Sequence, residues 1–137
     1  MDVGGFLGFC TEGIVQYVDA EHVSILDQSP NQMTKVKSKS SLNGVTFIEG
    51  DAENLPFQSG CFDLATSAGS IEYCPEPQQG IMEAYGVLKL GGYATMISPI
   101  RATNAIICTW AQIHDHQLLL PHHIFFAVHG PLDSVIN

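Results

Sequence analysis

Short apolar segments alternate with helical patterns over the first hundred or so residues, and this alternation constrains the fold most. Buried strands are expected at 23–27, 45–49, 62–67 and 93–100, and only Asp2 and Val3 stand where a first strand should precede the glycines. Each helical connection carries the chain back to the end of the sheet at which the previous strand began, so the next strand runs parallel to it. The pattern predicts an α/β fold with a doubly wound, Rossmann-like parallel sheet whose first strand is truncated.

Two of the expected helices are indicated by apolar spacing. The first covers Gly8–Val18, where the spaced apolar residues are Phe9, Ile14, Val15 and Val18. Another carries Ile81, Ala84, Tyr85 and Leu88 at i, i+3, i+4 and i+7. Gly91 and Gly92 are expected to terminate this helix.

A helix between these two is indicated by its start signal. Ser29 can cap it, Pro30 suits the first helical position, and Gln32 can reach back as the partner in a capping box. Met33 and Val36 are expected to face inward. The lysines that follow are expected to be solvated at the carbonyl end, and these are Lys35, Lys37 and Lys39.

Composition limits the class of protein and of partner. The 137 residues, 45% of them apolar, fit one globular domain. The formal charge of −9 arises from 14 acidic and 5 basic residues, so no basic patch can neutralise a series of phosphates, and nucleic acid is excluded as an expected partner. The four cysteines show no CxxC or metal-ligand spacing, which indicates reduced thiols.

Residues 101–137 differ from the preceding part, residues 1–100, which we expect to form the domain. After Arg101 the chain has no Lys or Arg, five of the six histidines and no clear period. Because the histidines lack accompanying cysteines or paired carboxylates, no metal site is expected. We expect an irregular, atypical His-rich tail.

The glycine cluster after Asp2 does not match the familiar phosphate-binding patterns. Gly4, Gly5 and Gly8 do not satisfy G-x-G-x-x-G, which argues against a nicotinamide-dependent oxidoreductase. A P-loop is excluded because Ile14 stands where its lysine would be needed. A loop without positive charge that opens on an acid suits a ligand that is partly cationic.

Acidic residues follow successive strands, where ligands bind in doubly wound folds. Asp27 ends the second strand about 20 residues beyond the glycines, a spacing at which a carboxylate can accept ribose hydroxyls. Asp51 ends the third strand, and its carboxylate with the backbone amide of Ala52 can meet an adenine edge. S-adenosyl-L-methionine, with its sulfonium, ammonium, ribose and adenine, fits this set.

The chain from Asp2 to about Pro99 resembles the class I S-adenosylmethionine-dependent methyltransferases. The stretches that carry the resemblance are "DVGGFLGF", "ILDQSP", "EGDAENLPF" and "EAYGVLKLGG". "SAGSIEYCPEPQQGIMEAYGVLKLGG" is closest to the enzymes that methylate 2-methyl-6-phytyl-benzoquinol and its solanesyl analogue. The resemblance implies an incomplete class I methyltransferase fold and a cofactor site that lies at Asp2, Gly4, Gly5, Gly8, Asp27, Gln28, Asp51, Ala52 and Ser67.

The resemblance also implies methyl transfer to a ring carbon of a prenylated benzoquinol, on the routes to tocopherol and plastoquinone. Glu72 or Tyr73 would then be the candidates to take the phenolic proton. A location at the chloroplast inner envelope follows from the resemblance alone, with membrane contact only through the substrate. The alternative is a non-catalytic methyltransferase-fold remnant, because Phe6 and Leu7 put bulk where the family usually has glycine and a small hydroxyl residue.

Overall fold

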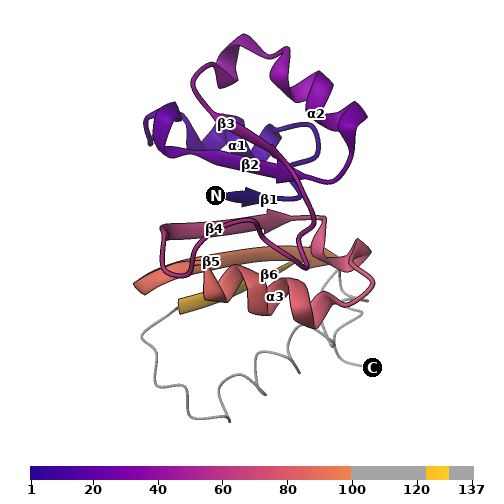
Figure 1. Ribbon diagram of the computed structural model, residues 1–137, viewed down its shortest axis with the longest axis vertical. Coiled ribbons are helices and arrows are strands. Elements are labelled where there is room, and N and C mark those ends of the chain that lie inside the picture. The colour runs from indigo at the N-terminus through magenta and orange to yellow at the C-terminus, as the bar shows by residue number, and fades with distance from the viewer. Residues whose placement is uncertain (100–122, 130–137) are drawn as a thin grey trace.

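A single parallel sheet organises the protein in the computed structural model, which describes residues 1–99 and 123–129. Its strands are β1 (Asp2–Val3), β2 (Ser24–Asp27), β3 (Thr46–Glu49), β4 (Phe62–Ala68), β5 (Leu88–Pro99) and β6 (His123–His129). They lie in the order β3-β2-β1-β4-β5-β6, and every neighbouring pair is parallel. Figure 1 shows β1 between the two halves of the sheet. The predicted α/β sheet is confirmed.

Helices cover both faces of this sheet. They are α1 (Phe9–Ile14), α2 (Pro30–Lys37) and α3 (Pro77–Gly86), with the 3-10 helices η1 (Ala20–His22), η2 (Ser40–Leu42) and η3 (Ile71–Tyr73). Alternation along β2 divides the core, because Ile25 packs in a cluster with Val36 while Leu26 packs in another with Ile81. The two faces are therefore covered by α2 and α3 respectively, which makes the fold doubly wound.

The start of α2 follows the predicted signal. Ser29 caps the helix by accepting a hydrogen bond from the Gln32 amide, 3.4 Å between Oγ and N, and Pro30 occupies the first turn. The expectation of a solvated lysine is wrong for Lys39. Its Nζ lies 2.8 Å from Glu12 Oε2 and 4.4 Å from the centre of the Phe9 ring. This lysine therefore ties the end of α2 to α1.

Helix α1 is shorter than its apolar spacing predicted. It ends at Ile14 instead of Val18, and the side chains of Phe9 and Val18 are exposed. Its buried residue is Thr11, whose hydroxyl has a buried acidic partner described below. Because a polar contact anchors α1, apolar spacing was a poor guide to its bounds.

Helix α3 ends earlier than Gly91 and Gly92 predicted. The helix ends at Gly86, and Leu88 pairs with Phe62 as the first residue of β5. The amides of Cys61 and Phe62 both bond to the carbonyl of Val87, each at 2.9 Å, which draws the chain into the sheet. Gly92 lies within β5, where an added Cβ would be 2.9 Å from the Lys89 carbonyl oxygen.

The expectation of an irregular tail does not hold for residues 123–129. These residues form β6 and pair with β5 from Tyr93↔His123 to Pro99↔His129. A continuous apolar run such as "IFFAV" fits a buried strand, but periodicity alone does not distinguish it from a helix. The question of a metal at His114, His116 and His122 lies outside the described residues.

The close approach of the β1 turn to β2 predicts opposite effects at two glycines. A Cβ on Gly5 would lie 2.3 Å from Ile25 Cδ1, whereas a Cβ on Gly13 would meet nothing within 4 Å. Gly5→Ala should therefore lower the free energy of unfolding by about 1–3 kcal/mol through overpacking. Gly13→Ala should raise it by about 0.5–1 kcal/mol, because alanine favours helix. Urea unfolding of both variants tests this, and equal effects would contradict the packing.

Candidate functional site

A buried carboxylate fixes the base of the glycine turn. Asp2 is 1% exposed, and its carboxylate accepts hydrogen bonds from the hydroxyls of Thr11 at 2.6 Å and Thr66 at 3.1 Å. Burial raises the pKa of Asp2, while these two hydrogen bonds oppose the rise. Asp2 therefore joins β1, α1 and β4 from beneath the turn.

The turn after Val3 requires glycine for reasons of space and of conformation. The amides of Gly4 and Gly5 both donate to the Leu26 carbonyl, at 2.7 and 3.2 Å. Gly4 has φ of 67°, and a Cβ there would be 2.1 Å from Ser70 Oγ. The backbone of the turn therefore packs directly against β2 and against the loop after β4.

Asp27 holds this turn to the start of α2. Its Oδ2 accepts from the Phe6 amide at 3.0 Å, and its Oδ1 accepts from the Ser29 amide at 2.8 Å. Phe6 has φ of 47°, a left-handed conformation that is uncommon for a bulky residue. The bond to Asp27 helps to hold Phe6 there, with its side chain 54% exposed.

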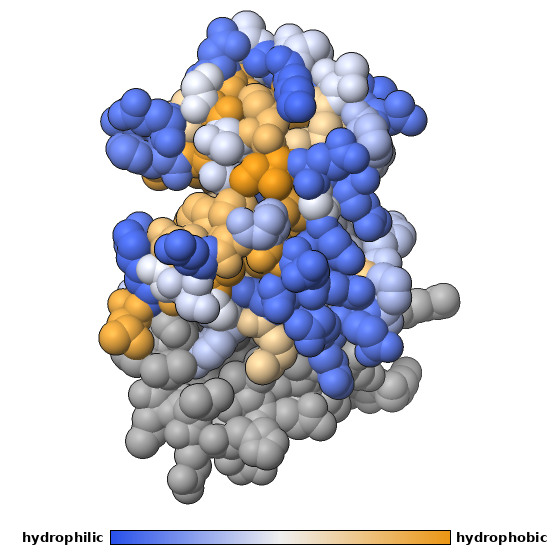
Figure 2. All heavy atoms as spheres, in the orientation of Figure 1, coloured by the Kyte–Doolittle hydropathy of each residue, from blue (hydrophilic) through white to orange (hydrophobic). Residues whose placement is uncertain are grey.

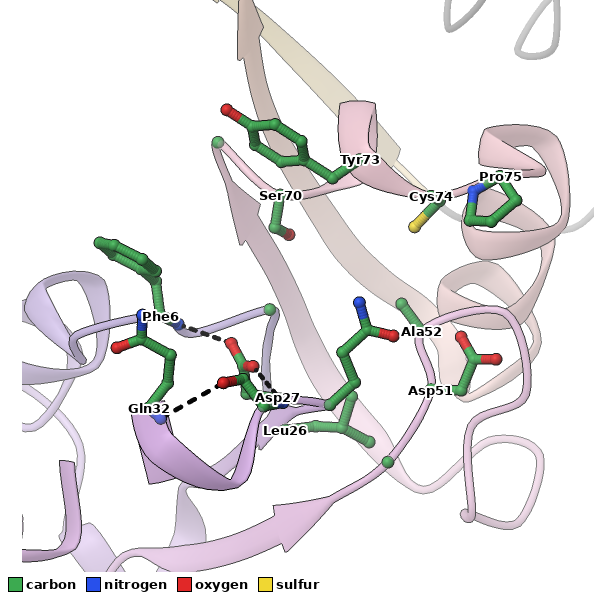
Figure 3. Close-up of a pocket in the computed structure, with 15 residues that line it drawn as sticks. Phe6, Leu26, Asp27, Gln32, Asp51, Ala52, Ser70, Tyr73, Cys74 and Pro75 are labelled. Carbon is green, nitrogen blue, oxygen red and sulfur yellow. Dashed lines mark hydrogen bonds between the residues drawn. The ribbon is translucent and has the colours of Figure 1, made fainter. Parts of the chain in front are cut away.

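A cavity of about 450 Å³ lies at the carboxyl ends of β1 to β4, where the strand order reverses (Figure 3). This volume falls in the range of roughly 300–1,000 Å³ that small-molecule sites occupy. One wall comes from the β1 turn, the end of β2 and the start of α2. The opposite wall follows β3 and β4. The lining residues are Gly4, Phe6, Leu26, Asp27, Gln28, Ser29, Gln32, Gly50, Asp51, Ala52, Gly69, Ser70, Tyr73, Cys74 and Pro75.

Of the nine residues predicted for the cofactor, five line this cavity. They are Gly4, Asp27, Gln28, Asp51 and Ala52. Asp2, Gly5, Gly8 and Ser67 do not line it. Gly8 precedes α1 with φ of 75°, and buried Ser67 shares a 2.8 Å hydrogen bond with Ser70, which does line the cavity. These four residues support the site from behind.

The two candidates for proton removal are placed differently. Tyr73 lines the cavity and is 78% exposed. Glu72 is half-buried and does not line the cavity. It lies in η3, between Ser70 and Cys74, and both of those residues line the cavity. Its Oε2 is buried and has no hydrogen-bond partner within residues 1–99 and 123–129. The hydrogen-bonding capacity of this oxygen is therefore unused among the described residues.

Sequence reasoning missed most of the residues in the wall that follows β3 and β4. Gly69, Ser70, Cys74 and Pro75 line the cavity, and none was predicted to do so. They follow β4 directly, so the rule that ligands bind beyond the carboxyl ends of strands could have found them. Gln32 was assigned only to a helix cap, and its place in the cavity depends on how α2 packs.

The lining of the cavity is acidic. Asp27 and Asp51 contribute carboxylates, and no lysine, arginine or histidine is among the lining residues that the structure describes. Burial, followed by the charges of Glu53, Asp51 and Glu72, raises the pKa of the Cys74 thiol to about 11. Figure 2, in the orientation of Figure 1, shows a central apolar area with hydrophilic residues around it. The cavity suits a cationic ligand better than a phosphate.

A model of a methyltransferase domain family matches residues 1–96, and the matched region contains both walls of the cavity. The chain belongs to this methyltransferase family. It is 59% identical over 103 residues to the chloroplastic 2-methyl-6-phytyl-1,4-hydroquinone methyltransferase 1 of Oryza sativa subsp. japonica. That match covers 75% of this chain and 31% of the rice protein, so the chain spans less than a third of that relative. The resemblance seen in the sequence motifs is confirmed.

Solved structures agree on the fold. An S-adenosylmethionine-dependent methyltransferase of Thermotoga maritima is 26% identical with a TM-score of 0.57, over 68% of this chain and 40% of that chain. The YcgJ protein of Bacillus subtilis is 19% identical with a TM-score of 0.65, over 89% of this chain and 54% of that chain. The second likeness supports the fold alone, and both confirm the Rossmann-like class.

The environment of Cys74 predicts slow alkylation. With a pKa of about 11, roughly one thiol in a thousand is ionised at pH 8, against about a quarter for an unperturbed cysteine. Iodoacetamide should therefore label Cys74 about a hundredfold more slowly than a free thiol at pH 8, and the rate should rise toward pH 11. Peptide mapping by mass spectrometry measures this, with exposed Cys61 as the internal reference. Equal labelling of both cysteines at pH 8 would contradict the burial and the acidic surroundings described for Cys74.

Proposed function

We propose that this chain is the S-adenosyl-L-methionine-binding part of a methyltransferase that methylates a ring carbon of a prenylated benzoquinol. One observation carries the proposal: the glycine turn, Asp27 and Asp51 converge on one cavity that has acidic but no basic lining residues. The name of the rice relative supports the acceptor class, since it acts on 2-methyl-6-phytyl-1,4-hydroquinone. Residues 1–100 would form most of the cofactor domain, and residues 123–129 add β6 to its sheet.

The residues present fit the cofactor. Asp27 would receive the ribose hydroxyls, Asp51 and the Ala52 amide would meet the adenine, and the turn at Gly4 would lie against the methionine part. When bound, S-adenosylmethionine supplies an electrophilic methyl group on a sulfonium. The carboxylates would stabilise its cationic groups, because opposite charges attract strongly where solvent is partly excluded. Phe6 lines the cavity without filling it, so its bulk does not exclude the cofactor.

We expect the protein groups that meet the acceptor to come from η3, since its Tyr73 lines the cavity. Glu72 would take the phenolic proton, which raises electron density on the ring carbon that receives the methyl group. That carbon would then lose its own proton to water, which restores the aromatic ring. Tyr73 lines the cavity as an exposed ring and would contact the acceptor ring face or edge. Beyond proton removal, catalysis would depend mainly on the alignment of the acceptor with the methyl group.

We further propose a location at the chloroplast inner envelope, since the rice relative is named as chloroplastic. In the described residues, no helix has both the length and the apolar character to cross a membrane. We propose that the prenyl chain of the substrate contacts the membrane.

Cofactor binding is the first test. S-adenosylhomocysteine, the demethylated product, should bind the full chain with micromolar affinity in calorimetric titration. Asp27→Ala should weaken binding by about 10- to 100-fold, because hydrogen bonds to charged groups contribute about 1.5–3 kcal/mol. Asp19→Ala, at an exposed aspartate outside the cavity, should have no effect. Absence of binding by the unaltered chain would instead favour the non-catalytic remnant.

Proton removal is the second test. Glu72→Gln should lower kcat for methylation of 2-methyl-6-phytyl-1,4-hydroquinone by about 10²- to 10⁴-fold, the usual contribution of a general base. The affinity for S-adenosylhomocysteine should change less than about twofold, since Glu72 does not line the cavity. Glu21→Gln, at an exposed site on η1, is the matched control. An unchanged kcat in Glu72→Gln would eliminate this residue as the base.

A further inference from the structure

Phe6 has a backbone conformation that its own side chain disfavours. With φ of 47°, it is the one non-glycine residue with positive φ in residues 1–99 and 123–129. A bulky side chain destabilises this left-handed conformation, which glycine adopts freely. The bond that holds the residue is donated by its backbone amide to Asp27 Oδ2, and a glycine could donate the same bond. The turn therefore does not need the phenyl ring for this contact.

The ring also adds little packing to offset the strain. Phe6 is 54% exposed and belongs to neither of the two core clusters. Its ring instead lines the cavity. Strained residues of this kind are concentrated at ligand sites, where the strained conformation serves the ligand. The phenyl ring is therefore expected to contact a ligand.

The surroundings of Phe6 combine two features that attract a cation. Its amide nitrogen lies 3.0 Å from Asp27 Oδ2, and both residues line the cavity (Figure 3). The face of a phenyl ring carries partial negative charge and attracts a cation within about 6 Å of its centre. No lysine, arginine or histidine is among the described lining residues, so no cationic side chain of the wall competes for this ring. A ligand cation held near Asp27 would also lie near the ring.

The chemistry of the ligand identifies the cation. In S-adenosylmethionine the sulfonium is bonded to C5′ of the ribose, whose hydroxyls Asp27 would receive. The turn at Gly4 would lie against the methionine part, on the other side of the sulfur. Phe6 follows Gly4 by two residues and is bonded to Asp27, so it belongs to the segment between these two contacts. The group of the ligand that lies between them is the sulfonium.

We infer that the Phe6 ring binds the sulfonium of S-adenosylmethionine by a cation–π contact and so favours this cofactor over its uncharged thioether product. The inference rests on the proposed function, because it requires the cofactor in this cavity. Phe6 is then a specificity-determining residue that distinguishes the two ligands by charge. The contact weakens once the sulfur is uncharged, which would favour release of the product.

The test measures dissociation constants by calorimetry for three ligands. S-adenosylmethionine carries the sulfonium, S-adenosylhomocysteine carries a neutral thioether, and sinefungin carries a protonated amine at the position of the methyl group. The proteins are the unaltered full chain, Phe6→Leu, Phe6→Tyr, Phe6→Gly and the control Phe9→Leu, whose phenylalanine is exposed and does not line the cavity.

The expected result is a loss that depends on the charge of the ligand. Phe6→Leu should weaken binding of the two cationic ligands by about 3- to 5-fold and of S-adenosylhomocysteine by less than about twofold, because an exposed cation–π contact contributes a few-fold in affinity. Phe6→Tyr keeps an aromatic ring and should retain the affinity ratio of the unaltered chain. Phe9→Leu should leave all three affinities unchanged.

The outcomes separate the inference from the proposed function. If the unaltered chain binds none of the three ligands, both fail. If it binds them, but Phe6→Leu changes all three affinities alike, leaves them unchanged or weakens S-adenosylmethionine alone, the inference is overturned while the cofactor site stands. Far-UV circular dichroism checks that Phe6→Leu is folded. If it is not, Phe6→Gly decides, since glycine favours the left-handed conformation, and an unaltered affinity ratio in that variant overturns the inference.

Discussion

The buried carboxylate of Asp2 holds together the elements on which the cavity depends. Strand β1 has only two residues, yet it occupies the centre of the sheet between β2 and β4. Two strand residues supply few ladder bonds, so the bonds from Thr11 and Thr66 to Asp2 help to fix α1 and β4 around them. Burial opposes the charge on this carboxylate, and the two hydroxyl donors offset part of that cost. The glycine turn is placed by this cluster.

Asp27 also holds separate elements together, at the surface of the cavity. By binding the amides of Phe6 and Ser29, it joins the glycine turn to the start of α2. The same bonds keep Phe6 in a left-handed conformation and leave the Gln32 side chain without its usual capping partner. One carboxylate thus holds two other lining residues, Phe6 and Ser29, by their backbone amides.

The acidic lining explains the choice of ligand class better than the glycines do. Glycine turns at this position of a parallel sheet serve many nucleotides, and phosphates normally need basic or backbone donors. Here the described lining residues offer carboxylates and no cationic side chains. A sulfonium and an ammonium group are the charges that such a wall would stabilise. This agrees with membership of the methyltransferase family.

Much of the fold was determined by local sequence. Three features could be predicted from the sequence: the buried strands with alternating helices, the start of α2 at Ser29 and Pro30, and the acids at the ends of β2 and β3. They depend on short-range periodicity and on the polarity of strand ends. The bounds of α1 and α3 and the strand at 123–129 were not readable. Contacts between elements accompany these features: Thr11 of α1 bonds to Asp2 of β1, Cys61 bonds to Val87 just after α3, and residues 123–129 pair with β5.

At the site, as in the fold, some features could be predicted from the sequence and others were decided by the tertiary structure. Of the residues that the sequence and the family resemblance indicated, Gly4, Asp27, Gln28, Asp51 and Ala52 line the cavity at the carboxyl ends of strands. Only the tertiary structure showed that Asp2 lies beneath the turn instead of in the cavity, and that Gln32 lines it. Whether a polar side chain is buried as support or faces a ligand depends on the packing of segments distant in sequence, which no local pattern encodes.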